Sequence, residues 1–517
     1  MVNVAILGFG VVGSGVAEVL DTNGRHIEGK VDDLIRLKYI LDVRDFPDSP
    51  FAGKVVHDFS VIEQDPEVSI VVETIGGAKA ALDFTRRALQ AGKSVITSNK
   101  ELVAEHGCEL LRLAQEKGVS YLFEASVGGG IPIIRPLNQC LAANEIEEIT
   151  GILNGTTNYI LTRMIRAGLS FDDALREAQA NGYAEQDPTA DIEGHDACRK
   201  ICILASLAFG RHIYPRQVPT EGITGVTLAD VAYADSCGKK LKLLGRAIRR
   251  TDGKVCAYVA PHLVDRENPL SGVEDVFNAI AVRGNAIGDV MFYGRGAGKL
   301  PTASAVVADV IDAAKHRDEK KRMFWAEGGD DTAVPPDGLE SRWYLRGTGV
   351  QAAEAAFPDS TRLIRPGALC PAAVNAVWLA APLPEPLLQP CPQGVHALLR
   401  PGDRHRLHVL SQLKAHILVY PALDLTVSGL AGPLEAVAER PDGAGIDLGL
   451  LQKVKCQKRK RTVHALISHS DCTLHTGYQT RRTLSNRRHV LSKADLFSPQ
   501  GRRSGNRRRK SFAFSTV

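Results

Sequence analysis

The sequence has few cysteines and lacks any long hydrophobic run. Its 517 residues include ten cysteines, and none of them forms a CxxC pair, so neither a disulfide framework nor a zinc knuckle is indicated. No apolar stretch approaches the roughly 18 residues that a membrane-spanning helix needs. No basic segment followed by an apolar core and a cleavage site opens the chain. We therefore expect a cytoplasmic protein with reduced thiols and no membrane partner.

Aromatic residues are also scarce, at 6%, whereas glycine occurs 48 times. This balance suits an α/β protein punctuated by glycine turns, and the length suits roughly two to four domains. The net charge of +4 is unevenly spread, because residues 451–517 hold 17 Lys or Arg and only two acidic residues. The remaining body is therefore acidic. We expect no nucleic-acid partner except through the basic tail.

Short apolar runs alternate with helical periodicities along the first 125 residues. Strands are expected at residues 4–7, 37–43, 69–74, 94–97 and 120–123, with helices between them. This alternation predicts a Rossmann domain, a doubly wound parallel sheet, over residues 1–125. A helix around residues 306–310 would complete it within residues 300–315. Residues 126–299 predict a second, α+β domain, with strands at 146–153 and 255–263 and helices at 158–166, 171–181 and 194–209.

The character of the sequence changes after residue 315. Residues 316–400 begin with a charged run and become proline-rich from residue 366, so we expect a linker there, with a short strand at 341–346 and a helix at 350–357. Residues 401–517 form an atypical basic tail with weak periodicity and clustered arginines. We expect that tail to be largely disordered.

A glycine-rich turn joins the first expected strand to the first expected helix. It reads Gly8-Phe9-Gly10-Val11-Val12-Gly13. Gly8 permits the tight turn, Gly10 lets the backbone approach a pyrophosphate, and Gly13 lets helix and strand pack closely. The free N–H groups of the helix would face the phosphates. The turn predicts a dinucleotide site; the alternative is an ordinary turn.

The end of the second expected strand reads Asp42-Val43-Arg44-Asp45. An acid there would accept a hydrogen bond from the ribose 2′-OH of NAD, whereas an arginine would pair with the 2′-phosphate of NADP. Both residue types are present, and Arg44 favours NADP. The alternative is that Arg44 only ends the strand.

Acidic residues are densest between Gly182 and Lys200. A helix starting near Gly194 would place Asp196 and Lys200 four residues apart on one face, and a lysine held among carboxylates in a cleft can transfer protons. Lys100 follows the strand at 94–97, at the sheet edge where open α/β sheets bind ligands. The alternatives are a solvated ion pair and a surface lysine.

Three consecutive glycines, Gly128 to Gly130, follow the expected strand that ends at Phe123. Such a loop lets carbonyl groups converge, so it could hold a hard cation together with Glu124. A flexible turn between two domains is an equally good interpretation.

Together these motifs resemble the homoserine dehydrogenases. The similarity spans about residues 2–316 and includes GILNGTTNY at 151–159, the cluster at 185–200 and GRGAGKLPT at 294–302. The resemblance implies the reversible NAD(P)H-dependent reduction of aspartate 4-semialdehyde to homoserine, in the branch that leads to threonine, methionine and isoleucine. It also implies that residues 126–299 bind the substrate and form a homodimer.

The resemblance further implies roles for individual residues. Lys200 would be the acid–base and Lys100 would assist it near the nicotinamide, while Asp196 would hold Lys200. Glu185, Asp191 and Asp196 would bind the substrate ammonium. The residues implied at the cofactor are Gly8, Phe9, Gly10, Val11, Val12, Gly13, Arg44, Lys100 and Gly298. Sodium or another monovalent cation would bind at Glu124 and at the carbonyls of Val127, Gly129 and Ile131.

The C-terminal region resembles the family less. Residues 342–346 and 350–357 resemble the opening of a regulatory ACT domain, but no βαββαβ pattern follows. Two other functions remain open: another NAD(P)-dependent amino-acid dehydrogenase, or a non-catalytic NADP-sensing protein whose basic tail binds nucleic acid. Lys100, Glu185, Asp196 and Lys200 argue against a sensor, because a sensor need not keep them.

Overall fold

The computed structural model describes residues 1–31, 33–317, 319 and 323–336, together with seven later strand segments between residues 340 and 463. It divides into two units, Met1–Ser428 and Gly429–Val517. In the second unit, β18 (Val454–Lys455) pairs antiparallel with β19 (Thr462–Val463). Every residue predicted to serve a site lies in the first unit.

A six-stranded parallel sheet opens the chain, in the order β3-β2-β1-β4-β5-β6. Its strands are β1 (Val2–Leu7), β2 (Ile35–Leu41), β3 (Val55–Val56), β4 (Val68–Glu73), β5 (Ser94–Thr97) and β6 (Tyr121–Leu122). The strand order reverses between β1 and β4, and the carboxyl ends of strands at such a switch point form the ligand crevice. The predicted Rossmann sheet is thereby confirmed.

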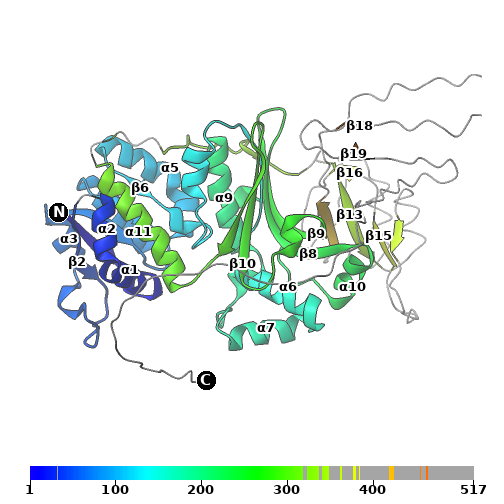
Figure 1. Ribbon diagram of the computed structural model, residues 1–517, viewed down its shortest axis with the longest axis horizontal. Helices are drawn as coiled ribbons and strands as arrows, with labels where there is room; N and C mark the ends of the chain where they lie inside the picture. The colour runs from blue at the N-terminus through cyan, green and yellow to red at the C-terminus, as the bar shows by residue number, and fades with distance from the viewer. Residues whose placement is uncertain are drawn as a thin grey trace, which may run out of the picture. The chain divides into compact units, whose positions relative to one another are not determined.

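Helices cover both faces of this sheet because neighbouring strand residues point to opposite sides. Val4 and Ile6 share a core with α1 and α11, whereas Ala5 and Leu7 share one with α4 and α5. The helices are α1 (Val11–Thr22), α2 (Gly24–Val31), α3 (Phe59–Gln64), α4 (Lys79–Gln90), α5 (Lys100–Lys117) and α11 (Lys299–Lys315). In Figure 1, α11 in green lies beside α1 and α2 in blue. The helix expected at residues 306–310 is the middle of α11.

The second sheet is mixed and has the order β11-β10-β7-β8-β9-β17-β13-β15-β14. Its first five strands are antiparallel neighbours: β7 (Ile146–Ile152), β8 (Lys239–Arg249), β9 (Val255–Asp265), β10 (Phe277–Gly284) and β11 (Gly288–Arg295). Sequence analysis found β7 and β9 but missed β8, β10 and β11. The apolar pattern that would have predicted β8 is interrupted by Lys242, a lysine that the fold nevertheless buries, since it is only 1% exposed.

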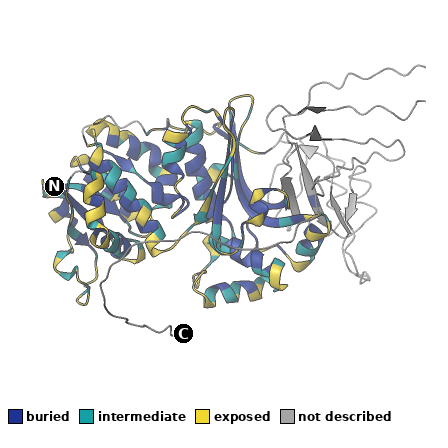
Figure 2. Cartoon of the chain, viewed as in Figure 1, coloured by how far each residue is buried: buried dark blue, intermediate teal, exposed yellow. Residues whose placement is uncertain are grey.

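The helices of this second part are α6 (Gly155–Ala167), α7 (Phe171–Ala180), α8 (Thr189–Ile192), α9 (His195–Phe209) and α10 (Leu228–Ser236). Helix α9 packs against α5 of the Rossmann part and against β8 and β9 of the second sheet, and it lies between them in Figure 1. Its residues from Ile201 to Ser206 are all buried, as expected of a helix that is covered on every side. Most residues of β1, β4, β7, β8 and β9 are buried, and Figure 2 colours buried residues dark blue.

The chain after α11 contributes to both parts. Trp325 is 1% exposed and its indole N–H donates to Nδ1 of His212 at 3.1 Å. The expected strand at 341–346 is β13 (Glu340–Gly347), and the Tyr344 hydroxyl donates to Asp230 at 2.6 Å. The remaining strands are β12 (Ala333–Val334), β14 (Thr361–Leu363), β15 (Ala376–Leu379), β16 (Leu383–Pro384) and β17 (Leu418–Leu423).

Two expectations about the C-terminal region concern residues that the structure does not describe. The helix at 350–357 and most of the tail at 401–517 lie outside the described residues. The domain boundaries at residues 125, 299, 316 and 400 stay predictions. Among the described residues, no helix combines the length and the apolarity needed to cross a bilayer.

Candidate active site

The glycine turn leaves open space above the N-terminus of α1. Gly8 has a φ of +88°, and a Cβ on Gly13 would lie 1.9 Å from the carbonyl oxygen of Gly8. On Gly10, by contrast, a Cβ would meet no atom within 4 Å. Gly10 is the N-cap of α1 and no side chain caps that helix. The turn is therefore tightly packed at Gly8 and Gly13 but faces open space at Gly10, and this space fits a bound pyrophosphate.

Asp42, directly after β2, supports this turn. One of its carboxylate oxygens accepts from the N–H of Phe9 at 2.8 Å, and the other accepts from the N–H and Nε of Arg44 at 3.0 Å. The hydrogen bond from Arg44 lowers the pKa of Asp42 to about 2. The Asp42 side chain is 7% exposed and that of Arg44 is 61% exposed. Arg44 is thus the residue of this pair that a ligand can reach.

An ion cluster of Asp196, Lys200 and Lys100 joins α9 to α5. The Lys100 ammonium lies 2.7 Å from one oxygen of Asp196 and the Lys200 ammonium lies 2.7 Å from the other. Lys200 also donates to the carbonyl oxygen of Leu153 at 2.7 Å. The side chains of Asp196 and Lys200 are 4% and 10% exposed, whereas that of Lys100 is 41% exposed. Lys100 therefore forms the open side of the cluster.

The pKa values of the two lysines are shifted in opposite directions. Burial lowers the pKa of Lys200, and the nearby Asp196 carboxylate opposes this only in part. Burial also disfavours the charge of Lys100, but Asp196 outweighs it and raises the pKa of Lys100. Although burial disfavours a charged Asp196, the two ammonium groups hold its pKa well below the usual range. The cluster thus keeps one lysine firmly charged and makes the other easier to deprotonate.

Asn154 completes the cluster and was missed from the sequence. Its side-chain N–H groups donate to Asp191 at 2.7 Å and to Asp196 at 2.8 Å, while its oxygen accepts from the N–H of Thr157 at 2.8 Å. It is thereby the N-cap of α6 as well as the link between two carboxylates. The available signal was an asparagine directly before a helix, in the segment 151–159.

The structure brings Asp191 to the cluster but shows no such contact for Glu185. Burial raises the pKa of Asp191, and the charge of Asp196 adds to this effect. Glu185 is exposed, and its main-chain carbonyl oxygen accepts from the side-chain nitrogen of Gln179 at 3.1 Å. Binding of a ligand by Glu185 stays a prediction.

The carboxylate of Glu124 is occupied by main-chain groups. It is 3% exposed and accepts from the N–H groups of Ile133, Ile134 and Arg135 at 2.6, 2.8 and 2.8 Å. The N–H of Glu124 itself donates to Asp309 at 2.8 Å. In the described part of the chain, no group of three or more His, Cys, Asp or Glu could hold a metal ion. A cation here would have to rely on main-chain oxygens.

Two glycine loops meet beside Glu124. Gly129 has a φ of +54°, and a Cβ on it would lie 2.3 Å from the carbonyl oxygen of Gly296. The N–H of Gly130 donates to the carbonyl oxygen of Arg295 at 3.1 Å. The loop that contains Val127, Gly129 and Ile131 therefore touches the loop that leads to Gly298, the N-cap of α11.

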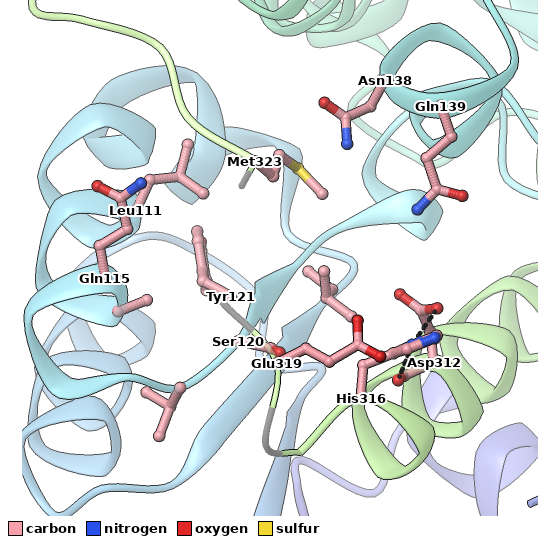
Figure 3. A pocket seen from close by; sticks show the side chains of 13 residues that line it. Leu111, Gln115, Ser120, Tyr121, Asn138, Gln139, Asp312, His316, Glu319 and Met323 are labelled. Carbon is pink, nitrogen blue, oxygen red and sulfur yellow. Dashed lines mark hydrogen bonds and ion pairs between the residues drawn. The ribbon is translucent and has the colours of Figure 1, made fainter. Parts of the chain in front are cut away.

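A separate cavity of about 760 Å³ lies near the far end of α5 (Figure 3). Figure 3 shows Leu111 and Gln115 of α5 on one side, and Asp312 of α11 with His316, the residue directly after α11, on another. None of the predicted site residues lines it. Leu111 is eleven residues along α5 from Lys100, or roughly 16 Å at the rise of an α-helix. The cavity is distinct from the Asp196 cluster.

An open glycine turn at the switch point of a parallel sheet, together with a buried lysine–carboxylate cluster, defines an NAD(P)-dependent dehydrogenase. Family models agree with this class. Residues 8–124 match the homoserine dehydrogenase NAD-binding domain, and residues 132–311 match the homoserine dehydrogenase domain. These two matches cover more than half of the chain, so the chain belongs to the homoserine dehydrogenase family.

Relatives and solved structures support the assignment. Homoserine dehydrogenase of Neisseria gonorrhoeae is 41% identical over 355 residues, which are 67% of this chain and 81% of the relative. The enzyme of Pseudomonas aeruginosa is 42% identical over 353 residues, with the same coverage. The crystal structure of a homoserine dehydrogenase from Thiobacillus denitrificans has a TM-score of 0.71 and 33% identity, covering 82% of this chain and 98% of that one.

The chain is accordingly an oxidoreductase that acts on a CH–OH group. It interconverts L-aspartate 4-semialdehyde and L-homoserine with a nicotinamide cofactor. A hyperthermophilic archaeal homoserine dehydrogenase mutant, with a TM-score of 0.53 and 30% identity over 62% of this chain and 99% of that one, has been solved in complex with NADPH. The two other functions left open by the sequence, a different amino-acid dehydrogenase and a non-catalytic sensor, are set aside.

The first prediction separates the two roles of the glycine turn. Gly10→Ala should leave the melting temperature of the cofactor-free protein unchanged, because a Cβ there meets nothing, yet it should weaken nicotinamide cofactor binding by at least about tenfold, since it fills the space above the helix N-terminus. Gly13→Ala should lower the melting temperature by itself. The measurements are thermal unfolding and cofactor titration. Unchanged binding by Gly10→Ala would place the pyrophosphate elsewhere.

Proposed function

We propose that Lys200 is the general acid–base of the reaction, with Asp196 and Lys100 controlling its charge and position. The observation that carries the proposal is one buried carboxylate held 2.7 Å from each of two ammonium groups. When bound, the nicotinamide supplies or accepts the hydride. During reduction, the protonated Lys200 donates its proton to the substrate oxygen; during oxidation, the neutral amine accepts it. The lowered pKa of Lys200 favours the neutral form that oxidation needs.

Lys100 has the complementary role. Its pKa is raised beside Asp196, so it stays charged, and its side chain is the most exposed of the three. A fixed ammonium beside the substrate oxygen stabilises the negative charge that develops there. Asp191, Asp196 and Glu185 would hold the substrate ammonium, and Asn154 supports this by orienting the first two carboxylates.

The cofactor is NADP in preference to NAD. Asp42 would be the natural partner of the ribose 2′-OH of NAD, but both its oxygens already accept hydrogen bonds from Phe9 and Arg44. Arg44 follows it with an exposed guanidinium. Phe9 to Gly13 and Lys100 would line the same cofactor, and Gly298 would approach it from α11.

A monovalent cation such as sodium would bind to main-chain oxygens of Glu124, Val127, Gly129 and Ile131. The proposal is supported by the positive φ values of Gly128 and Gly129, which let successive carbonyls turn toward one point. Exchanging sodium for choline at constant ionic strength should lower the melting temperature if that cation is bound. No step of the proton transfer depends on it.

The enzyme would act as a homodimer formed through its second part. Strand β11 is the first strand of the mixed sheet, so one of its edges is unpaired by the described strands. It exposes Met291 and Tyr293 at 40% and 54%, and an exposed apolar edge strand is a ready site for pairing with a second copy. Sedimentation at micromolar concentration tests this, with a monomer contradicting it.

The second prediction concerns Lys200. Lys200→Ala should lower kcat for homoserine oxidation by about 10²–10⁴-fold, the usual contribution of acid–base catalysis, with cofactor affinity little changed. Lys240→Ala is the control, because it removes a lysine of β8 whose ion pair is with Glu274, outside the cluster. Near-normal turnover of the Lys200 variant would remove this residue from the mechanism.

The third prediction concerns Arg44. Arg44→Ala should weaken NADP binding by about 1.5–3 kcal/mol, typical of a hydrogen bond between charged groups, and should change NAD binding far less. Arg36→Ala removes an equal charge from an exposed position on β2 and should leave both affinities unchanged. Isothermal titration with each cofactor decides the question. Equal losses for NAD and NADP would show that Arg44 does not read the phosphate.

A further inference from the structure

Another buried carboxyl group lies at the crevice edge of the parallel sheet, and the steps described above do not use it. Glu73 is the last residue of β4 and is fully buried. One oxygen accepts from the N–H of Ile75 at 2.7 Å, and the other accepts from the hydroxyl of Thr97, at the end of β5, at 2.5 Å. Burying a carboxyl group is costly unless donors surround it. The burial of Glu73 therefore indicates a specific role for its carboxyl group.

The hydrogen bonds continue from Thr97 in one direction. The Thr97 hydroxyl oxygen accepts from the N–H of Asn99 at 2.9 Å. A hydroxyl group has a single proton to donate. Thr97 donates this proton in its hydrogen bond to Glu73, while its oxygen accepts the hydrogen bond from Asn99. Burial raises the pKa of Glu73 to about 7, and in its ionised form a Glu73 oxygen accepts the hydrogen bond from Thr97 and completes the chain.

Asn99 ends this chain at the first turn of α5. Its side-chain oxygen accepts from the N–H of Leu102 at 3.0 Å, which makes it the N-cap of the helix. Its side-chain nitrogen donates to the carbonyl oxygens of Ile75 and Gly77 at 3.2 and 2.8 Å. The loop after β4 and the start of α5 are therefore locked together around Glu73. Lys100 is the first residue of α5.

We propose that Glu73 is a positioning residue for the reaction. Acting through Thr97 and Asn99, it fixes the first turn of α5 and so holds the Lys100 ammonium against Asp196. This inference rests on the role proposed for Lys100. The alternative is that Glu73 only links the end of β4 to the end of β5 through its hydrogen bond with Thr97. In that case its loss would change the stability of the folded protein and leave the position of Lys100 unchanged.

The experiment compares turnover and folding in the full-length protein. Glu73→Gln keeps the shape but puts a donor where the chain needs an acceptor, and Thr97→Val keeps the shape but removes the hydroxyl. Each should lower kcat for homoserine oxidation by about 10–100-fold, since a displacement of about 1 Å in an active site can cost this much, with KM for the cofactor within about twofold. Thr97→Ser keeps the hydroxyl and should restore most of the turnover lost in Thr97→Val.

Ser69→Ala is the matched control on β4, because the Ser69 hydroxyl oxygen is buried without a hydrogen-bond partner and is not part of the chain. Its kcat should equal that of the unmodified enzyme. Equal turnover of Thr97→Ser and Thr97→Val, or normal turnover of Glu73→Gln, would overturn the inference. If Glu73→Gln does not fold, the threonine pair alone decides.

A double-mutant cycle distinguishes positioning of Lys100 from any other role. With Lys100→Met present, Glu73→Gln should lower kcat by no more than about twofold, because no ammonium remains to be misplaced. A loss as large as in the unmodified enzyme would show that Glu73 acts independently of Lys100 and would overturn the inference. Normal turnover of Lys100→Met alone would instead overturn the role proposed for Lys100, and the inference would fall with it.

Discussion

The rest of the structure depends on the placement of one buried carboxylate between two lysines. Asp196 cannot be buried alone, since an isolated charge in a protein interior costs several kcal/mol or more. It is held by Lys200 from its own helix and by Lys100 from α5. Helix α9 must therefore lie against both the Rossmann part and the second sheet, and its apolar residues from Ile201 onward supply that contact. Helix α9 therefore carries both the packing contact between the two parts and two residues of the candidate catalytic cluster.

The residues of the candidate site lie at the beginnings of helices. Gly10 and Gly298 precede α1 and α11, Lys100 is the first residue of α5, Asn154 caps α6, and Asp196 is the second residue of α9. The first turn of a helix presents unpaired N–H groups and the positive end of its dipole. Such surroundings favour phosphates, carboxylates and a developing alkoxide, the negative groups that this reaction brings together.

Sequence patterns predicted the parts of the fold whose signal is local. The alternation of strands and helices in residues 1–125 and the four-residue spacing of Asp196 and Lys200 both follow from backbone periodicity. Asn154 and Glu73 were missed because their roles depend on residues far along the chain, such as Asp196 at 42 positions from Asn154 and Thr97 at 24 from Glu73. The carboxylate of Glu124 shows the same limit, since its three main-chain donors lie at the start of a short helical segment whose approach to Glu124 periodicity does not encode.

The pairing of Lys100 with Asp196 also restricts how small molecules enter and leave. Pulling α5 away from α9 would strip Asp196 of one partner, so wide separation of the two parts is electrostatically costly. The glycine loops around Gly129 and Gly296, which touch each other without side chains between them, are free of this restriction. Entry to the crevice by local movement of the chain is therefore expected to cost less electrostatic energy than entry by separation of α5 from α9.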